Sequence, residues 1–272
     1  EVYQGLMAVL VPGYEPVATS DYFDRELAQA AAREDLEAPA ERHASLVPDT
    51  YKTEVAPSVA LEHVRMVQRL DGRPAAMTWA IHEQQAVVWV CTSDVPARFA
   101  QIAGIFTHNG LDILSATAFT LEDGTVLDRF TVRMKDRPIN PDPNFWGTVE
   151  DDLVLAIDGQ LEVAPELREK AEEKSESDEI SSHRSIASVH FDNRRGRPFT
   201  AVDIVARDRV GLLFSLADAL GAEGLDIEFA QILTRGELAR DVFFVTDAGS
   251  GRPVTDEARL ESIRQAVMAA TE

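Results

Sequence analysis

Cysteine is nearly absent from this sequence of 272 residues, which contains only Cys91. A single cysteine excludes a disulfide framework within the chain. Cys91 lies in the apolar run 86–91 with no histidine close in sequence, so we expect a buried, unreactive thiol. Apolar runs of about 18 residues are also missing, so the sequence predicts no membrane-spanning helix.

Positive charge is scarce. The chain has 26 Lys and Arg against 47 Asp and Glu, which gives a formal net charge of -21 at pH 7. Non-specific binding to nucleic acid or to an anionic membrane surface needs a basic face, so both partner classes are disfavoured. The start of the chain also lacks a basic region followed by an apolar stretch. We therefore expect no signal peptide and a cytoplasmic location.

Residues 1–80 predict a helical or irregular segment, which we interpret as the tail of an upstream domain plus a linker. Good helix formers dominate residues 23–37, and apolar residues three apart predict a short helix over 59–70. Three prolines between them predict a broken connector over 38–58. Because the chain begins with Glu rather than Met, we expect it to be a piece of something longer.

A different pattern begins at residue 86. The valine-rich run 86–92 predicts a strand, and apolar residues at helical spacing over 99–106 predict a helix. Asn109 and Gly110 provide a helix stop. Strands are predicted over 112–121 and 126–134, joined by a tight turn, and a helix with an interruption is expected over 151–174.

The same pattern returns in the last third of the chain. A strand is predicted over 200–206, a helix from about Gly211 to Gly224, and two strands over 226–234 and 239–247. A final helix is expected over 255–270, with Thr255 as its N-cap.

The two stretches align at a nearly constant offset. It is 114 residues from Asp94 to Asp208 and from Gly110 to Gly224, and 113 residues from Asp128 to Asp241. Loss of one residue in a hairpin turn is expected, because loops tolerate deletions. Internal similarity of this kind indicates duplicated small domains.

These elements predict an α+β fold with two ferredoxin-like βαββαβ domains in tandem after a mostly helical N-terminal segment. We expect the first domain over 86–193, with a helical insert at about 140–180 and a further strand over 188–193. The second is expected over 200–272, without a final strand. An open antiparallel sheet needs cover for its edge, so the two copies should pair side by side.

The turn before the second-repeat helix is the main candidate for a binding site. Gly211 permits a positive φ or a close approach, and the helix start offers free N–H groups to an anion. We expect a ligand to contact Asp208, Arg209, Val210, Gly211, Leu212 and Leu213, and a weaker site in the first repeat at Asp94, Val95, Pro96, Ala97 and Arg98. The alternative is structural: Asp208 caps the helix and Gly211 eases packing.

Catalytic motifs are not apparent in the chain. The six histidines do not cluster at metal-ligand spacing, and we expect His63 to be an ordinary surface or interface residue. No glycine-rich phosphate loop is present. Asp123 and Asp128 flank a hairpin and are interpreted as turn and surface residues rather than an acid–base pair.

Three segments resemble the ACT domain, a family of small regulatory modules that bind amino acids. They are DRVGLL over 208–213, GLDI over 224–227 and DVFFVTD over 241–247. The tandem is most similar to the C-terminal part of bifunctional protein-PII uridylyltransferase/uridylyl-removing enzymes. A terminal helix after residue 247, a long insert before VHFDN over 189–193 and PDTY over 48–51 leading to LEH over 61–63 favour that family. The resemblance covers about residues 45–272.

The resemblance implies regulation in nitrogen control, with glutamine as the amino acid and the PII signal protein as a partner of the parent enzyme. It also implies nucleotidyltransferase and phosphohydrolase domains, with magnesium needed in the former. Neither domain is apparent here: no Gly-Ser motif with paired aspartates stands in a suitable setting, and no His-Asp dipeptide occurs. We therefore expect no catalysis and no cofactor in the chain as given.

The ligand carboxylate would meet backbone N–H groups around Val210, Gly211 and Leu212, and Asp208 would accept from its α-amino group. Ala97 stands where the second repeat has Gly211, which predicts a weaker or purely structural first site. The competing class is a ligand-free ACT module that dimerises or docks a partner. A bulky residue at position 211 separates the two, because a sensor would lose its ligand response whereas an interaction module would lose assembly.

Overall fold

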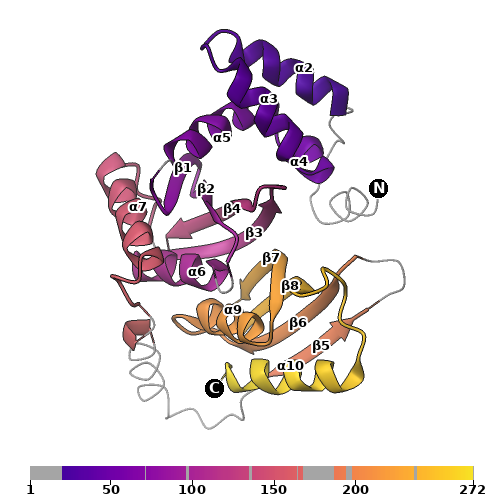
Figure 1. The fold of residues 1–272 in the computed structure, drawn as a ribbon. Helices are drawn as coiled ribbons and strands as arrows, with labels where there is room; N and C mark the ends of the chain where they lie inside the picture. Colours follow the sequence, from indigo (N-terminus) through magenta and orange to yellow (C-terminus); the bar gives the residue numbers. More distant parts are fainter. Residues whose placement is uncertain are drawn as a thin grey trace. The chain divides into compact units, whose positions relative to one another are not determined.

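A computed structural model describes residues 20–70, 72–95, 98–134, 137–163, 165–167, 187–193, 198–235 and 238–271 (Figure 1). The chain divides into two compact units. The first comprises the described residues up to Thr78 together with Val90–Asp94 and Phe119–Asp128. The second comprises Trp79–Trp89, Val95–Ala118 and the described residues from Arg129 onward.

The N-terminal part of the first unit is helical. Its described helices are α2 (Ser20–Ala31), α3 (Glu37–Leu46), α4 (Asp49–Glu54) and α5 (Pro57–Arg69). The expected broken connector over 38–58 is therefore wrong, since two helices occupy most of it. Its prolines lie at helix starts, where the missing N–H costs nothing: Pro48 precedes α4 and Pro57 opens α5.

Within the described ranges, eight strands form one sheet in the order β1-β2-β4-β3-β7-β8-β6-β5. The strands are β1 (Ala75–His82), β2 (Gln85–Ser93), β3 (Leu111–Thr120), β4 (Thr125–Met134), β5 (Ser188–Asp192), β6 (Thr200–Arg207), β7 (Leu225–Arg235) and β8 (Leu238–Asp247). The repeats join at antiparallel β3 and β7, where Ala116 faces Ala230. The α+β architecture and the tandem ferredoxin-like arrangement are thus confirmed.

Each half of the sheet is completed by a strand that precedes the repeat. Strand β5 pairs antiparallel with β6, Val189 opposite Ile204, and β1 lies beside β2 at the other edge. Each repeat therefore runs β-β-α-β-β-α, so the edge strand comes first rather than last. We assigned 188–193 to the first repeat, but its partner belongs to the second. The expected domain boundaries otherwise stay predictions.

Strand β1 was missed by the sequence reasoning. Ala75 precedes Ser188 by the same 113 residues that separate Asp128 from Asp241, so the duplication extends back to this strand.

Helices pack onto the sheet of the second unit and onto each other. They are α6 (Arg98–His108), α7 (Pro143–Ile157), α9 (Leu212–Ala222) and α10 (Glu257–Ala269). Helices α6 and α9, one from each repeat, are in contact. Gly104 permits this approach, because a Cβ there would lie 3.1 Å from Phe214 Cδ2.

Two helix starts differ from the sequence expectation. Helix α7 begins at Pro143 rather than near 151, because Asp142 caps it by accepting from the Asn144 N–H. Helix α10 is capped by Asp256, whose carboxylate accepts from the Arg259 N–H at 2.9 Å, and not by Thr255. Asp is as good an N-cap as Thr, and here it stands one residue closer to the helix.

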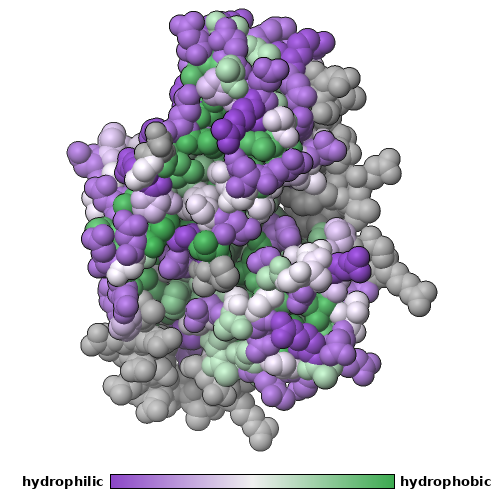
Figure 2. Space-filling model, viewed as in Figure 1, coloured by the Kyte–Doolittle hydropathy of each residue, from purple (hydrophilic) through white to green (hydrophobic). Residues whose placement is uncertain are grey.

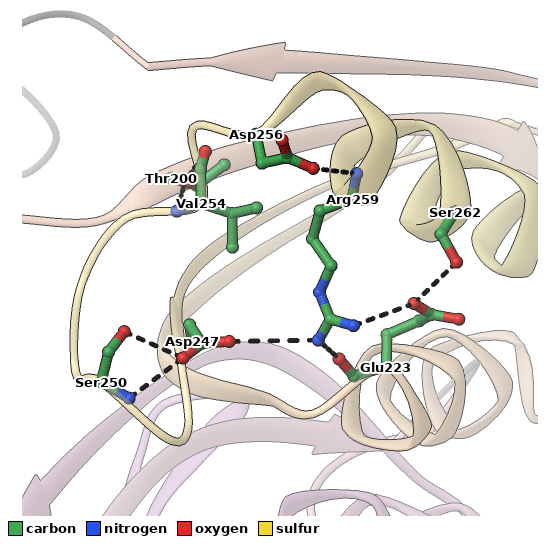
Figure 3. A network of polar contacts seen from close by, with 8 residues as sticks. All are labelled: Thr200, Glu223, Asp247, Ser250, Val254, Asp256, Arg259 and Ser262. Atoms are coloured by element: carbon green, nitrogen blue, oxygen red, sulfur yellow. Dashed lines mark hydrogen bonds and ion pairs between the residues drawn. The ribbon is translucent and has the colours of Figure 1, made fainter.

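A polar network around Arg259 ties the end of α9 to the start of α10 (Figure 3). The guanidinium donates to the carbonyl oxygen of Glu223 and lies 4.0 Å from the Asp247 carboxylate. Ser262 donates to the Glu223 carboxylate at 3.1 Å. These contacts hold α10 against the second repeat without a further strand.

The face of the molecule in Figure 2 is mostly hydrophilic, with smaller apolar areas between. Among the described residues, no helix has the length and hydropathy needed to cross a membrane.

Candidate ligand-binding site

The loop between β6 and α9 has the geometry that the sequence suggested. Gly211 is the N-cap of α9 with φ 75° and ψ 5°, a left-handed conformation that favours glycine. Its carbonyl accepts from the Ser215 N–H at 2.9 Å, which starts the helix. As a glycine, the N-cap residue itself has no side chain with which to cap α9. The structural alternative for Asp208, that it caps this helix, stays a prediction.

A pocket of about 470 Å³ opens beside this loop. Its lining residues come from both repeats and all belong to the second unit. The second repeat contributes all six residues that we singled out, Asp208, Arg209, Val210, Gly211, Leu212 and Leu213, together with Ile232, Ala239 and Asp241. The first repeat contributes Thr107, Gly110, Leu111, Asp112, Ile113, Arg133 and Met134. The pocket size falls within the range of small-molecule sites.

Asp241 is the buried carboxyl of the pocket, with 2% of its surface exposed. Burial, with a smaller contribution from the negative charge of Asp208, raises the pKa of Asp241 to about 7. A hydrogen bond from the backbone of Leu233 opposes that shift. The Oδ1 atom of Asp241 has no hydrogen-bond partner among the described residues.

The two arginines that line the pocket already contact groups of the chain. Arg209 donates to the Ala270 carbonyl at 2.7 Å and to Ser215 Oγ at 3.3 Å, and burial lowers its pKa. Arg133 Nε lies 3.6 Å from the Asp112 carboxylate. With three carboxyls and two guanidiniums, the lining has more acidic than basic groups.

The corresponding turn of the first repeat is only partly described. Pro96 and Ala97 lie outside the described residues. The Asp94 N–H donates to the Gly124 carbonyl at 2.9 Å, and Arg98 donates to Gln101 at 2.8 Å. Of the described residues, Asp94, Val95 and Arg98 are not in the lining of this pocket.

Asp241 and the first-repeat residues were missed by the sequence reasoning. The repeat alignment paired Asp241 with Asp128, which we interpreted as a surface residue; with 4% of its surface exposed, Asp128 is buried. The sequence did offer one indication that Asp241 is buried: an aspartate recurs at the equivalent position of an apolar strand in each repeat. Asp123, by contrast, is exposed and accepts from the Thr125 N–H in the hairpin turn, as expected.

The first unit contains a separate buried cluster of two histidines and a tyrosine. Tyr51 Oη lies 3.0 Å from His43 Nε2 and 2.6 Å from His63 Nδ1. His63 is fully buried, so the expected surface or interface position is wrong: its helix packs this side chain inward. Burial lowers the pKa of His43 to about 4, although nearby Asp123 opposes the shift.

Cys91 is buried, as expected, and burial raises the pKa of its thiol to about 12. In the described part of the chain, no three His, Cys, Asp or Glu side chains are grouped so that they could hold a metal ion.

The protein is thus an α+β protein of two tandem ferredoxin-like repeats, with a pocket where the repeats meet. No family model matches the chain. A bifunctional uridylyltransferase/uridylyl-removing enzyme of Gluconobacter oxydans is 32% identical over 213 residues, which cover 77% of this chain and 22% of that enzyme. The enzyme of the same name from Rhodospirillum rubrum is 31% identical over 99% of this chain and 29% of the enzyme. A third, from Phenylobacterium zucineum, is 31% identical over 85% of this chain and 24% of the enzyme.

The chain is thus homologous to a part of the bifunctional uridylyltransferase/uridylyl-removing enzymes. It spans about a quarter of the length of these curated relatives. The solved structure of an unknown protein from Galdieria sulphuraria matches with 13% identity and a TM-score of 0.22 over 70% of this chain and 92% of that one.

Proposed function

We propose that this chain is the regulatory, amino-acid-binding region of a protein-PII uridylyltransferase/uridylyl-removing enzyme, with glutamine as its ligand. The observation that carries the proposal is the pocket at the junction of the repeats, which gathers all six second-repeat residues selected from the sequence. The homology over nearly the whole chain supports the parent enzyme.

An amino acid carries one anionic and one cationic group, and the pocket has a counterpart for each. Helix α9 begins at the glycine N-cap Gly211, and the backbone N–H groups of its first turn suit the ligand carboxylate. Asp208 beside it suits the α-ammonium group. Each charge-assisted contact of this kind contributes about 1.5–3 kcal/mol.

Regulation follows from the position of the pocket between two repeats. A ligand that touches β3 and β4 of one repeat and α9 of the other favours the packing in which both are in place. In the parent enzyme this preference would be passed to the catalytic domains that modify the PII protein and that need magnesium. This coupling requires two sites and two states, as any allosteric mechanism does.

The test is titration of the 272-residue chain with glutamine by calorimetry, together with thermal unfolding. We expect saturable heat and a rise in Tm that grows with glutamine concentration, because a ligand that binds only the folded state stabilises it. Absence of both responses would contradict the proposal.

A matched pair of variants locates the site. Asp208→Asn should weaken glutamine binding by about ten-fold or more, since it removes the charge of one contact. Asp94→Asn is the same change in the other repeat, away from this pocket, and should leave the affinity unchanged. Equal effects of the two variants would argue against a site at the second-repeat turn.

A further inference from the structure

Asp241 lines the pocket, and one of its carboxyl oxygens lacks a hydrogen-bond donor among the described residues. The side chain is almost fully buried on β8, and its Oδ1 has no hydrogen-bond partner in the described part of the chain. The backbone of Leu233 supplies one hydrogen bond to this carboxyl, but a buried carboxylate oxygen without a donor is costly, so such atoms are normally paired.

The two arginines of the described pocket lining contact groups other than Asp241. The charged groups that line the pocket are Asp112, Arg133, Asp208, Arg209 and Asp241. Arg133 lies beside Asp112, and Arg209 donates to the Ala270 carbonyl and to Ser215. The charge that contributes to the raised pKa of Asp241 is the carboxylate of Asp208, which repels a second negative charge.

We propose that Asp241 is the ammonium subsite of the pocket: it receives the positively charged amino group of the ligand, which lies between Asp241 and Asp208. This inference rests on the proposed amino-acid ligand and adds a residue on β8 to the β6–α9 turn. It restricts the ligand to compounds with a protonated amino group next to a carboxylate.

A proton exchange follows from this arrangement. Burial and the neighbouring Asp208 hold the pKa of Asp241 at about 7, so near neutral pH the carboxyl is partly protonated before binding. An ammonium group stabilises the ionised form, and Asp241 releases its proton to solvent as the ligand binds. Glutamine affinity should therefore increase by about ten-fold between pH 6 and pH 8.

The experiment is calorimetric titration of the 272-residue chain with glutamine at pH 6, 7 and 8, each in two buffers with different ionisation enthalpies. The difference in heat between the buffers measures the protons released. We expect release at pH 6 and 7 that fades by pH 8, and no detectable binding of the glutamine analogue that lacks the α-amino group.

Asp241→Asn should abolish the proton release and weaken binding at pH 8 by about ten-fold or more. Asp128→Asn is the matched control, since it removes a buried aspartate at the equivalent strand position that is not among the pocket-lining residues. It should retain the affinity and the proton release.

The outcomes separate the two proposals. If glutamine binds with an affinity that is independent of pH, without proton release, the ammonium subsite at Asp241 is wrong while the amino-acid site stands. Equal binding of the analogue without the amino group has the same meaning. If glutamine does not bind at any pH, the proposed function fails and this inference fails with it. The wild-type measurement decides the matter even if Asp241→Asn does not fold.

Discussion

Single ionisable side chains make the stability of this molecule depend on pH in ways that can be tested. Asp241 and His43 are both buried, and burial favours the neutral form of each, which raises the pKa of an acid and lowers that of a base. Their contributions to stability therefore depend on pH in opposite directions.

For Asp241 we expect stability to decrease as the pH rises. The folded-state pKa of about 7 lies above the ordinary value of 3.8, so the folded state binds more protons between these limits. The stabilisation by the bound proton is complete below pH 4 and lost by pH 7, with a slope of at most about 1.4 kcal/mol per pH unit. Asp241→Asn should flatten this part of the profile in urea unfolding from pH 4 to 8. Parallel profiles would contradict the prediction.

For His43 we expect the reverse. The pKa of about 4 lies below the ordinary 6.5, so the unfolded chain takes up the proton first and stability falls as the pH drops from 6.5 to 4. Nitrogen NMR of the ring should show neutral imidazole at pH 5.5. His43→Gln, which can keep a hydrogen bond to Tyr51, should reduce the acid sensitivity of the first unit. A ring that is already charged at pH 5.5 would refute this assignment.

At the scale of single elements, the start of α9 depends on the conformation of one residue. Gly211→Ala places a Cβ at φ 75°, which should cost about 1 kcal/mol in unfolding free energy. Gly147→Ala is the matched control, because Gly147 lies inside α7 with nothing within 4 Å of the added Cβ. It should stabilise the protein by up to about 1 kcal/mol. Urea unfolding of both variants checks the opposite signs.

The elements also show how far a sequence can be interpreted by itself. Strands and helices of the two repeats were predictable because apolar spacing, Gly110 and Gly224 recur in both copies; both glycines adopt positive φ. Strand β1 was missed because no recurring glycine of this kind marks where it ends. The inward position of His63 and the pocket position of Asp241 depend on which face of an element the fold covers, and that is decided by contacts between segments far apart in the chain.

The lining of the candidate pocket was predictable only in part, for the same reason. The turn 208–213 could be found from one repeat alone. Residues such as Asp112 and Arg133 line the pocket only because β3 pairs with β7, and no local pattern reveals that pairing.

At the scale of the whole molecule, the β3–β7 junction can be tested directly. Ala116 and Ala230 face each other across antiparallel strands, so Ala116→Cys with Ala230→Cys should form a disulfide on mild oxidation. Buried Cys91 should not compete. Mass spectrometry of the digested protein detects the bond.

The matched control for that crosslink is Ser115→Cys with Ala230→Cys. Neighbouring residues of a strand point to opposite faces, so this pair should remain reduced under the same conditions. Equal crosslinking of both pairs would mean that the register is not the one described.

The early position of β5 in its repeat determines where the chain can be cut. A fragment that begins at Thr200 would keep the pairing of β6 with β8 but lose β5 from the other edge of β6, and α10 would lose the contacts to Val189 and Phe191 that Arg264 makes. An unpaired strand edge promotes aggregation. Anyone who wishes to express the second repeat by itself should therefore start before Ser188, even though the first conspicuous strand of that repeat begins twelve residues later.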